Sequence, residues 1–325
     1  MKTTPSAVRG RFAPTPSGLM HIGNLYAALM AWLHVRSEGG VFVLRMEDID
    51  RPRSQPRYAE QILSDLRWFG LDWDEGPDIG GPYGPYTQSE RLERYEAALD
   101  KLRKDGRLYP CYCSRAELLS IPSAPHGLAS EGPAYPGTCR SLSEEESARK
   151  ALVKTPSLRF RLSGADGAAF DDLVCGPLRF PPGAGGDFIV RRADGVFAYQ
   201  LAVVVDDAAM GITHVVRGAD LIDSTPRQLW LYDALRLSPP AFAHVPLLVD
   251  AAGERLSKRH RSLAAVKLRE AGMPPELLAG AIAHAAGLID RPEPAKPEEL
   301  IPEFRWSRLP KDVVRLPAGV LQPYM

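Results

Sequence analysis

A turn-rich loop near the N-terminus carries groups suited to binding phosphate oxygens. His21 stands between Gly18 and Gly23, after the strand-like residues 8–12 and at the start of a helical pattern. A loop that enters a helix presents free backbone N–H groups and the positive end of the helix dipole to an anion, and glycine lets the backbone approach closely. Taken alone, the loop is better explained as a proline-stiffened surface loop with one histidine.

A basic segment far along the chain suits the same ligand. It follows a turn at residues 250–253 and comprises Arg255, Leu256, Ser257, Lys258 and Arg259. Lysine is a compact point charge, so Lys258 could stabilise the charge that develops on a departing pyrophosphate. By itself this segment would be a solvated basic loop. The two segments together, in this order, favour a nucleotide-activating site to which both contribute.

An acidic residue follows the second strand-like segment, residues 41–45. Glu47 could contact a ligand there, because ligands bind at the carboxyl ends of strands in open α/β sheets. The alternative is a surface ion pair of Glu47 with Arg45 or Arg51, which would contribute less than about 1 kcal/mol. We favour the ligand-binding role.

Three of the four cysteines are grouped as metal ligands often are. Cys111, Cys113 and Cys139 would offer soft thiolates, which suit zinc, and a tetrahedral site needs a fourth ligand. Tyr135 is the candidate for that position, and buried free thiols are the alternative. Cys175 lies outside the pattern, and we expect it to be an ordinary buried thiol.

Strand-like and helical segments alternate along much of the chain, which predicts an α/β fold with a doubly wound parallel sheet. From residue 108 to residue 192, prolines, glycines and cysteines replace the amphipathic pattern, and we expect an inserted subdomain there. Further predictions are strands at 203–205 and 212–216, a hairpin turn at Asp194-Gly195, and a helix start at Ser224-Thr225-Pro226.

The bulk composition narrows the class of protein. Forty basic residues balance forty acidic ones among 325, so no global positive field attracts nucleic acid, and any RNA contact must come from local patches. The basic groups at 255–261 and 305–315 are candidates for phosphate contact, although each taken singly is better explained as solvated surface. We find no segment apolar and long enough for a membrane span, and no secretory leader. We therefore expect a cytoplasmic protein, with cysteines kept reduced.

The two segments that are suited to binding phosphate resemble the signatures of class I aminoacyl-tRNA synthetases. His21-Ile22-Gly23-Asn24 is similar to His-Ile-Gly-His, and residues 255–259 are similar to Lys-Met-Ser-Lys-Ser. The glutamate branch of that class is similar over nearly the whole chain, through residues 11–16, 45–50, 84–91 and 216–221. Asn24 departs from the signature, since it offers a neutral amide where the class has a second histidine.

This resemblance implies a role for each matching residue. It implies catalysis by His21 and Lys258, which would stabilise the leaving pyrophosphate, and a structural zinc ion on Cys111, Cys113, Tyr135 and Cys139. The ATP site, with Mg²⁺ accompanying the nucleotide, would use His21, Gly23, Asn24, Ser257 and Lys258. The L-glutamate site would use Arg11, Phe12, Ala13, Pro14, Thr15, Glu47, Tyr199 and Arg217.

It also implies a domain organisation. We expect a Rossmann-like nucleotide-binding domain in two halves, residues 1–107 and 193–262, separated by a zinc-containing subdomain at 108–192. Residues 263–325 would form a short helical C-terminal region. Only 66 residues follow Arg259, too few for the helical anticodon-binding region of a full glutamyl-tRNA synthetase.

The short C-terminal region and the zinc pattern together resemble those of the glutamyl-queuosine tRNA(Asp) synthetase family. Members activate glutamate with ATP and transfer it to the queuosine base at the wobble position of tRNA(Asp). One alternative is a compact glutamyl-tRNA synthetase that charges the tRNA 3′ end. Another is a non-catalytic paralogue that binds tRNA or an amino acid. We expect the protein to act as a monomer.

Overall fold

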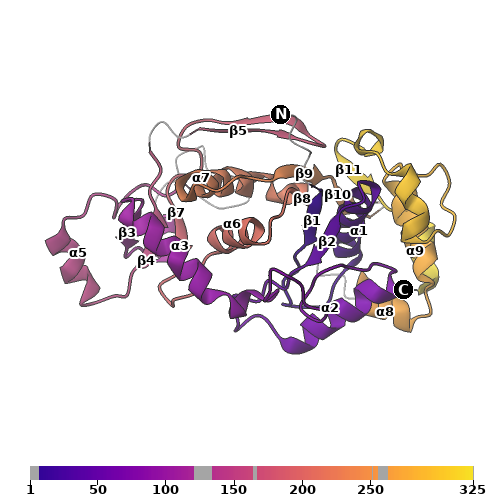
Figure 1. Cartoon of the computed structure of the whole chain (residues 1–325), viewed down its shortest axis with the longest axis horizontal. Coiled ribbons are helices and arrows are strands. Elements are labelled where there is room, and N and C mark those ends of the chain that lie inside the picture. Colours follow the sequence, from indigo (N-terminus) through magenta and orange to yellow (C-terminus); the bar gives the residue numbers. More distant parts are fainter. Residues whose placement is uncertain (1–6, 121–133, 164–166, 251, 255–262, 325) are drawn as a thin grey trace.

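A six-stranded sheet lies at the centre of the molecule in this computed structural model, which describes residues 7–120, 134–163, 167–250, 252–254 and 263–324 (Figure 1). Its strand order is β2-β1-β8-β9-β5-β6, and every neighbouring pair is parallel except β5 with β6. The predicted α/β class with a largely parallel sheet is therefore confirmed. The strands are β1 (Arg9–Phe12), β2 (Val41–Leu44), β5 (Ala168–Asp172), β6 (Gly176–Phe180), β8 (His214–Gly218) and β9 (Ala241–Val245).

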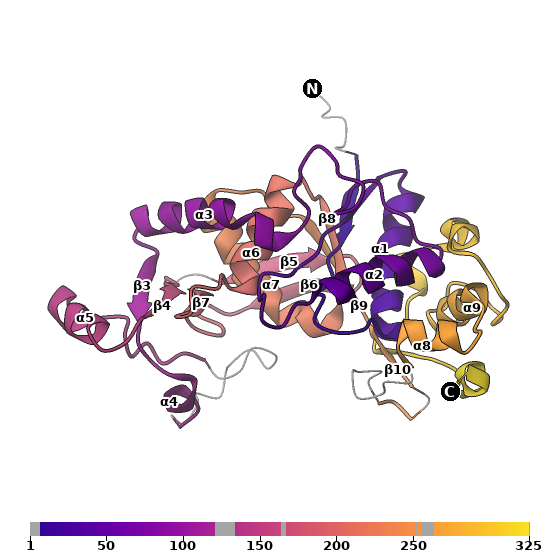
Figure 2. The ribbon, with the colours of Figure 1, turned by 90° about the horizontal axis from the view of Figure 1, so that it is seen from below.

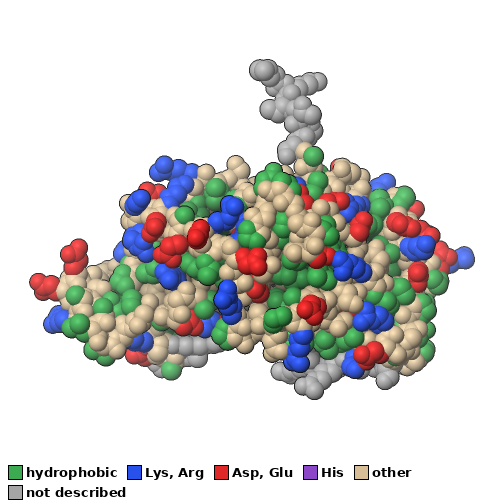
Figure 3. Space-filling view, turned by 60° about the horizontal axis from the view of Figure 1, so that its bottom comes forward, with side chains coloured by type: hydrophobic (Ala, Val, Ile, Leu, Met, Phe, Trp, Pro, Cys, Tyr) green, Lys and Arg blue, Asp and Glu red, His purple; other side chains and the backbone are tan. Residues whose placement is uncertain are grey.

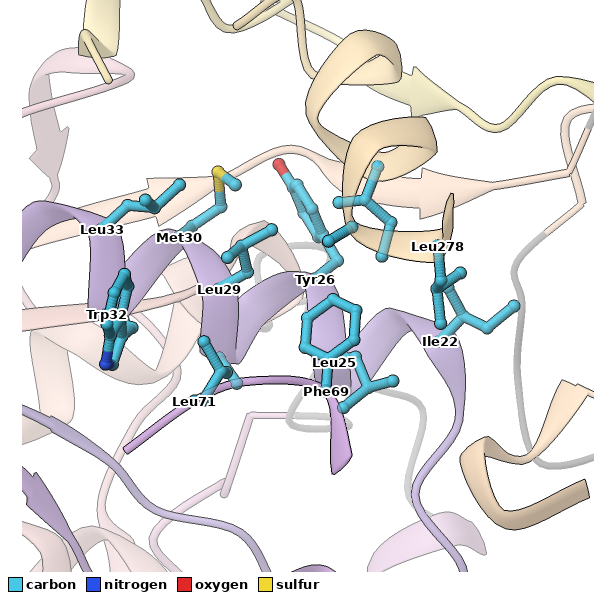
Figure 4. Packing of buried hydrophobic residues seen from close by; sticks show 14 of the residues in the cluster. Ile22, Leu25, Tyr26, Leu29, Met30, Trp32, Leu33, Phe69, Leu71 and Leu278 are labelled. Carbon is cyan, nitrogen blue, oxygen red and sulfur yellow. The ribbon is translucent and has the colours of Figure 1, made fainter. Parts of the chain in front are cut away.

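Helix α1 (Ile22–Ser37) packs against β1, β2 and β8 and forms the centre of the largest apolar core. Eleven of its side chains are buried, including Leu25 and Leu29, which lie close to Phe69 (Figure 4). The helix begins directly after the turn-rich loop at residues 13–21, called the first loop below, as the sequence predicts. Its start is thereby fixed relative to the carboxyl end of β1, where the loop leaves the sheet.

The prediction of a strand at residues 203–205 is wrong, because these residues belong to helix α6 (Tyr199–Ala209). All residues from 200 to 207 are buried, so the helix has no polar face that would reveal its 3.6-residue period. The run of valines then has the composition of a buried strand. Helix α7 (Thr225–Leu235) follows Ser224 with a proline in its first turn, as predicted, and α6 packs against both α7 and α3 (Leu92–Lys104).

A smaller antiparallel sheet of order β3-β4-β7 lies at one end of the molecule. Its strands are β3 (Leu108–Cys111), β4 (Ser157–Phe160) and β7 (Phe188–Arg191), and the accompanying helices are α4 (Arg115–Ser120) and α5 (Glu144–Ala151). The predicted turn at Asp194-Gly195 is present, with Gly195 at φ 87°. Only one bridge, Arg191 with Phe197, follows before α6 begins. Strands β5 and β6, from within the predicted insertion, extend the central sheet instead.

The C-terminal elements lie at the opposite end (Figure 2). Helix α2 (Pro56–Trp68) packs against α8 (Ala265–Glu270), and α9 (Pro275–Ala285) packs near α10 (Ala318–Leu321). Strand β10 (Leu247–Val249) pairs in parallel with β11 (Val313–Arg315). Short 3-10 helices are η1 (Gln88–Glu90), η3 (Ala219–Ser224), η5 (Pro297–Glu303), η6 (Trp306–Arg308) and η7 (Gln322–Tyr324).

The surface and helix lengths bear on two of the compositional predictions. Positive and negative side chains are interspersed on the face shown in Figure 3, without an extended basic area there. Among the helices that the structure describes, none combines the length and apolarity required to cross a bilayer.

Candidate active site

A cavity of about 670 Å³ opens where the first loop leaves β1 and where β8 and β9 end. This is the expected position for a ligand in an open α/β sheet. The structure brings eleven of the residues proposed from the sequence together in its lining. They are Arg11, Phe12, Ala13, Pro14, Thr15, His21, Gly23, Asn24, Glu47, Tyr199 and Arg217.

The first loop is held in place by backbone hydrogen bonds to the segment that follows β2. The amide of Arg45 donates to the carbonyl of Phe12, and that of Glu47 donates to the carbonyl of Pro14, both at 3.0 Å. The amide of Gln55 donates to Pro16, also at 3.0 Å. A proline has a carbonyl group but no backbone N–H. The prolines of the loop can therefore accept hydrogen bonds along this edge and have no backbone N–H group that would remain unpaired. Glu47 is thereby fixed beside the loop.

Asn24 closes the start of helix α1. Its side-chain Oδ1 accepts the backbone N–H of His21 at 3.1 Å, in the manner of a residue that reaches back to cap a helix. The amide oxygen is thus engaged within the protein, and the NH₂ group is the part of Asn24 that a ligand could use. The prediction for Asn24 can therefore be made more specific: toward a ligand, this residue can act only as a neutral hydrogen-bond donor.

Four charged groups of a larger buried network lie at the cavity wall, and two of them, Arg11 and Glu47, line the cavity. Arg45 contacts Glu47 at 3.1 Å and Asp207 at 2.7 Å, and Arg11 contacts Asp207 at 3.2 Å. The pairing of Arg45 with Glu47 was our alternative for Glu47, but the pair is buried, with Arg45 fully inaccessible. It therefore does not resemble the weak surface pair that we considered, because removing a partner would leave a buried charge uncompensated.

The surroundings shift the acidity of the two carboxylates in opposite directions. Burial raises the pKa of Glu47, and Arg45 and Arg11 oppose the rise. For Asp207, burial acts in the same sense, but the two arginines outweigh it and hold the pKa below its usual range. Asp207 therefore carries the negative charge that fixes Arg11 and Arg45.

Sequence reasoning missed Asp207 and its neighbour Asp206, which directly follow the segment 203–205 that we took for a strand. Asp206 is fully buried and accepts from Arg91 Nε at 2.6 Å, Tyr95 Oη at 2.8 Å and Gln88 Nε2 at 2.9 Å. Two adjacent acids inside an apolar run were the available signal, because a buried carboxylate requires a partner. The segment 84–91, noted only for its resemblance, is anchored to the core through this carboxylate.

Arg217 differs from the other buried arginines of the site. Among the described residues, no carboxylate lies within ion-pairing distance of its guanidinium. It donates to His244 Nε2 at 3.0 Å, Gln228 Oε1 at 2.8 Å and Thr225 Oγ1 at 2.7 Å, all neutral acceptors. Burial lowers its pKa and raises that of Tyr199, which lines the same cavity. The site therefore offers an uncompensated cation to a ligand.

The proposed residues Ser257 and Lys258, with Arg255 and Arg259, lie outside the residues that the structure describes. The chain that follows them lies beside the first loop. Ala264 forms an antiparallel bridge with His21, and the amide of Ala265 donates to Met20 at 2.9 Å.

The cysteine cluster is at the other end of the molecule, beside β3. The Sγ atoms of Cys111, Cys113 and Cys139 all lie within 4.8 Å of one another, with Cys113 and Cys139 at 3.7 Å. The Tyr135 hydroxyl is 3.3 Å from the sulfur of Cys111 and 3.7 Å from that of Cys113. Thiolates about 2.3 Å from a tetrahedral zinc ion would lie about 3.8 Å apart, so the donor set fits this metal.

The expectation for Cys175 is wrong, because this thiol is exposed. It lies in the tight turn between β5 and β6, and its amide donates to Asp172 Oδ1 at 2.9 Å. A turn of a two-stranded hairpin has few neighbours that could cover a side chain. The composition of the segment did not reveal the turn.

Comparisons with known proteins find a matching family, matching relatives and matching structures over nearly the whole chain. The family model for tRNA synthetases class I (E and Q), catalytic domain, matches residues 7–315. A protein named glutamyl-Q tRNA(Asp) synthetase from Symbiobacterium thermophilum is 64% identical over 313 residues, covering 96% of this chain and 97% of that protein. One of the same name from Nitratidesulfovibrio vulgaris is 53% identical over 317 residues, covering 97% of each. The crystal structure of a glutamate tRNA ligase from Elizabethkingia meningosepticum in complex with its amino acid superposes with a TM-score of 0.82 at 30% identity, covering 98% of this chain and 69% of that one.

Proposed function

We propose a reaction for this chain from the fact that it belongs to the class I tRNA synthetase family of the glutamate and glutamine type. It activates glutamate with ATP and transfers the glutamyl group to the queuosine base of tRNA(Asp). The observation that carries the first half is the buried, uncompensated Arg217 in a cavity that also holds Glu47. A dicarboxylic amino acid meets both needs, since its ammonium group suits Glu47 and a carboxylate suits Arg217.

In the activation step, the glutamate α-carboxylate attacks the α-phosphorus of ATP, the bond to the bridging oxygen breaks, and pyrophosphate leaves. The products are glutamyl-AMP and pyrophosphate. Mg²⁺ accompanying ATP would offset phosphate charge. We assign His21 and Lys258 to the leaving group, and the bridge between His21 and Ala264 supports this by holding the chain after residue 262 beside the first loop. In the second step a queuosine hydroxyl attacks the activated carbonyl and AMP departs.

The names of the two relatives, which this chain matches over 97% of their length, support queuosine as the acceptor. The direct test uses labelled glutamate, ATP and tRNA(Asp) that carries queuosine, followed by separation of anticodon-loop and acceptor-end fragments. We expect label in the anticodon loop and none with tRNA(Asp) that carries guanine there. Label at the 3′ end would instead indicate a compact glutamyl-tRNA synthetase. Absence of glutamate-dependent pyrophosphate exchange would indicate a non-catalytic paralogue.

We infer that Cys111, Cys113, Tyr135 and Cys139 hold one structural zinc ion, which would stabilise the subdomain formed by the smaller sheet. The purified protein should contain about one zinc per chain. Cys139→Ser should lose the metal and lower the melting temperature, because one of three thiolates is removed. Tyr135→Phe should keep the metal but release it faster to a chelator.

The exposed Cys175 provides the matched control, since Cys175→Ser removes a thiol outside the cluster. It should leave the zinc content unchanged by elemental analysis. Release of zinc from Tyr135→Phe to the chelator at the wild-type rate would show that the fourth ligand is not this hydroxyl.

We also propose that the enzyme acts in the cytoplasm and as a monomer, because the residues proposed for the site all come from one chain.

A further inference from the structure

Three buried side chains from adjacent strands form a line that ends at the cavity. Asp172 is the last residue of β5, His244 lies in β9, and Arg217 lies in β8. The Asp172 Oδ2 is 2.6 Å from His244 Nδ1, and His244 Nε2 is 3.0 Å from Arg217 Nε. The first two side chains are fully inaccessible and do not line the cavity, whereas Arg217 does.

The hydrogen bonds fix the tautomer of His244. An arginine Nε–H can only donate, so Nε2 of the imidazole must carry a lone pair. The ring proton therefore resides on Nδ1 and is donated to the Asp172 carboxylate. Burial lowers the pKa of His244, which keeps the ring neutral. An imidazole held by a carboxylate on one side and accepting on the other has its orientation set from behind.

This line determines how Arg217 faces a ligand. The guanidinium has five N–H groups, and three of them donate to His244, Gln228 and Thr225. Two N–H groups remain, one on each terminal nitrogen. Two donors suit a carboxylate, which has two acceptor oxygens, and suit an amide less well, because its NH₂ group would oppose an N–H.

We propose that Asp172 and His244 form a positioning pair that orients the guanidinium of Arg217 toward the side-chain carboxylate of the substrate. The pair thereby sets both the affinity for glutamate and the rejection of glutamine. This inference rests on the proposed function. It places a determinant of amino-acid specificity on β5, at the start of the hairpin turn that contains Cys175 and outside the cavity.

The substitution Asp172→Asn tests the pair with little change of shape. The remaining Oδ1 can still accept the backbone N–H groups of Val174 and Cys175, at 3.0 and 2.9 Å, so the turn is kept. The new NH₂ group would face Nδ1 of His244 and force the ring proton to Nε2. Two donors would then meet at Arg217 Nε. We expect the KM for glutamate to rise by roughly 10- to 100-fold and the KM for ATP to change by less than about twofold.

The variant His244→Gln provides the rescue, because its carbonyl oxygen can take the place of Nε2 and accept from Arg217. It should lose less glutamate affinity than His244→Leu, which offers no acceptor. The preference for glutamate over glutamine should fall in the same order. A role that is only structural would lower the active fraction, and hence kcat, without separating the KM for glutamate from that for ATP.

Asp171→Asn is the matched control, as the neighbouring residue on β5 is exposed. It should leave both KM values unchanged in glutamate-dependent pyrophosphate exchange. If wild type shows exchange but Asp172→Asn keeps the wild-type KM for glutamate, the positioning pair is refuted and the proposed function stands. If wild type shows no exchange with glutamate, the proposed function itself fails.

Discussion

Replacement of Arg217 by glutamine is expected to lower kcat/KM for glutamate by roughly two to three orders of magnitude. The arginine is buried, lines the cavity and has no acidic partner among the described residues, and we propose the side-chain carboxylate of the substrate as its counterion. Without the arginine, that carboxylate would lose its water without gaining a cation. Pyrophosphate exchange over a range of glutamate concentrations measures the effect.

Two further variants locate the cause of that loss. Arg217→Lys keeps a positive charge but not the paired donors, and should lie between wild type and Arg217→Gln. Arg179→Gln changes an exposed arginine on the edge strand β6 and should retain wild-type kinetics. Equal kinetics for Arg217→Gln and wild type would exclude this arginine as a carboxylate ligand.

Asp206→Ala should lower the free energy of unfolding by roughly 3–5 kcal/mol. The change leaves the buried guanidinium of Arg91 without its carboxylate, and removes the acceptor of Gln88 and Tyr95. Urea denaturation followed by circular dichroism gives the difference. Asp206→Asn should cost less, since one amide oxygen can still accept.

The control for this prediction is an aspartate–arginine pair of the same types on the surface. Asp100 pairs with Arg103 one turn later in α3, and each side chain is about half exposed. Asp100→Ala should change the free energy of unfolding by less than about 1 kcal/mol, because water already solvates both partners. Similar losses for the two variants would mean that burial of the Asp206 pair contributes nothing.

Local patterns allowed much of the central sheet to be predicted. The segments at β2 and β8 each contain a short apolar run, β1 directly precedes the turn-rich loop, and α1 has apolar side chains at helical spacing. Helix α6 could not be recognised, because tertiary burial on every side erases the period on which such a prediction depends. The pairing of β5 with β9 was also hidden, since it joins segments about 70 residues apart.

The candidate site was partly accessible to the same reasoning. Residues that belong to a motif and line the cavity, such as Glu47 and those of the first loop, could be proposed from their types and their positions in the sequence. Residues that act through another side chain could not. Asp172 and His244 carry no local signal, and their alignment with Arg217 exists only once three strands lie side by side.

Helix α6 presents two successive carboxylates in different directions, since neighbouring residues project about 100° apart around a helix. Asp206 is bound to the segment 84–91, while Asp207 is bound to the arginines at the cavity wall. The helix can therefore neither turn about its axis nor slide without breaking one of the two sets of bonds. The helix therefore forms a rigid wall of the site, and any adjustment to an incoming amino acid has to come from other walls of the pocket.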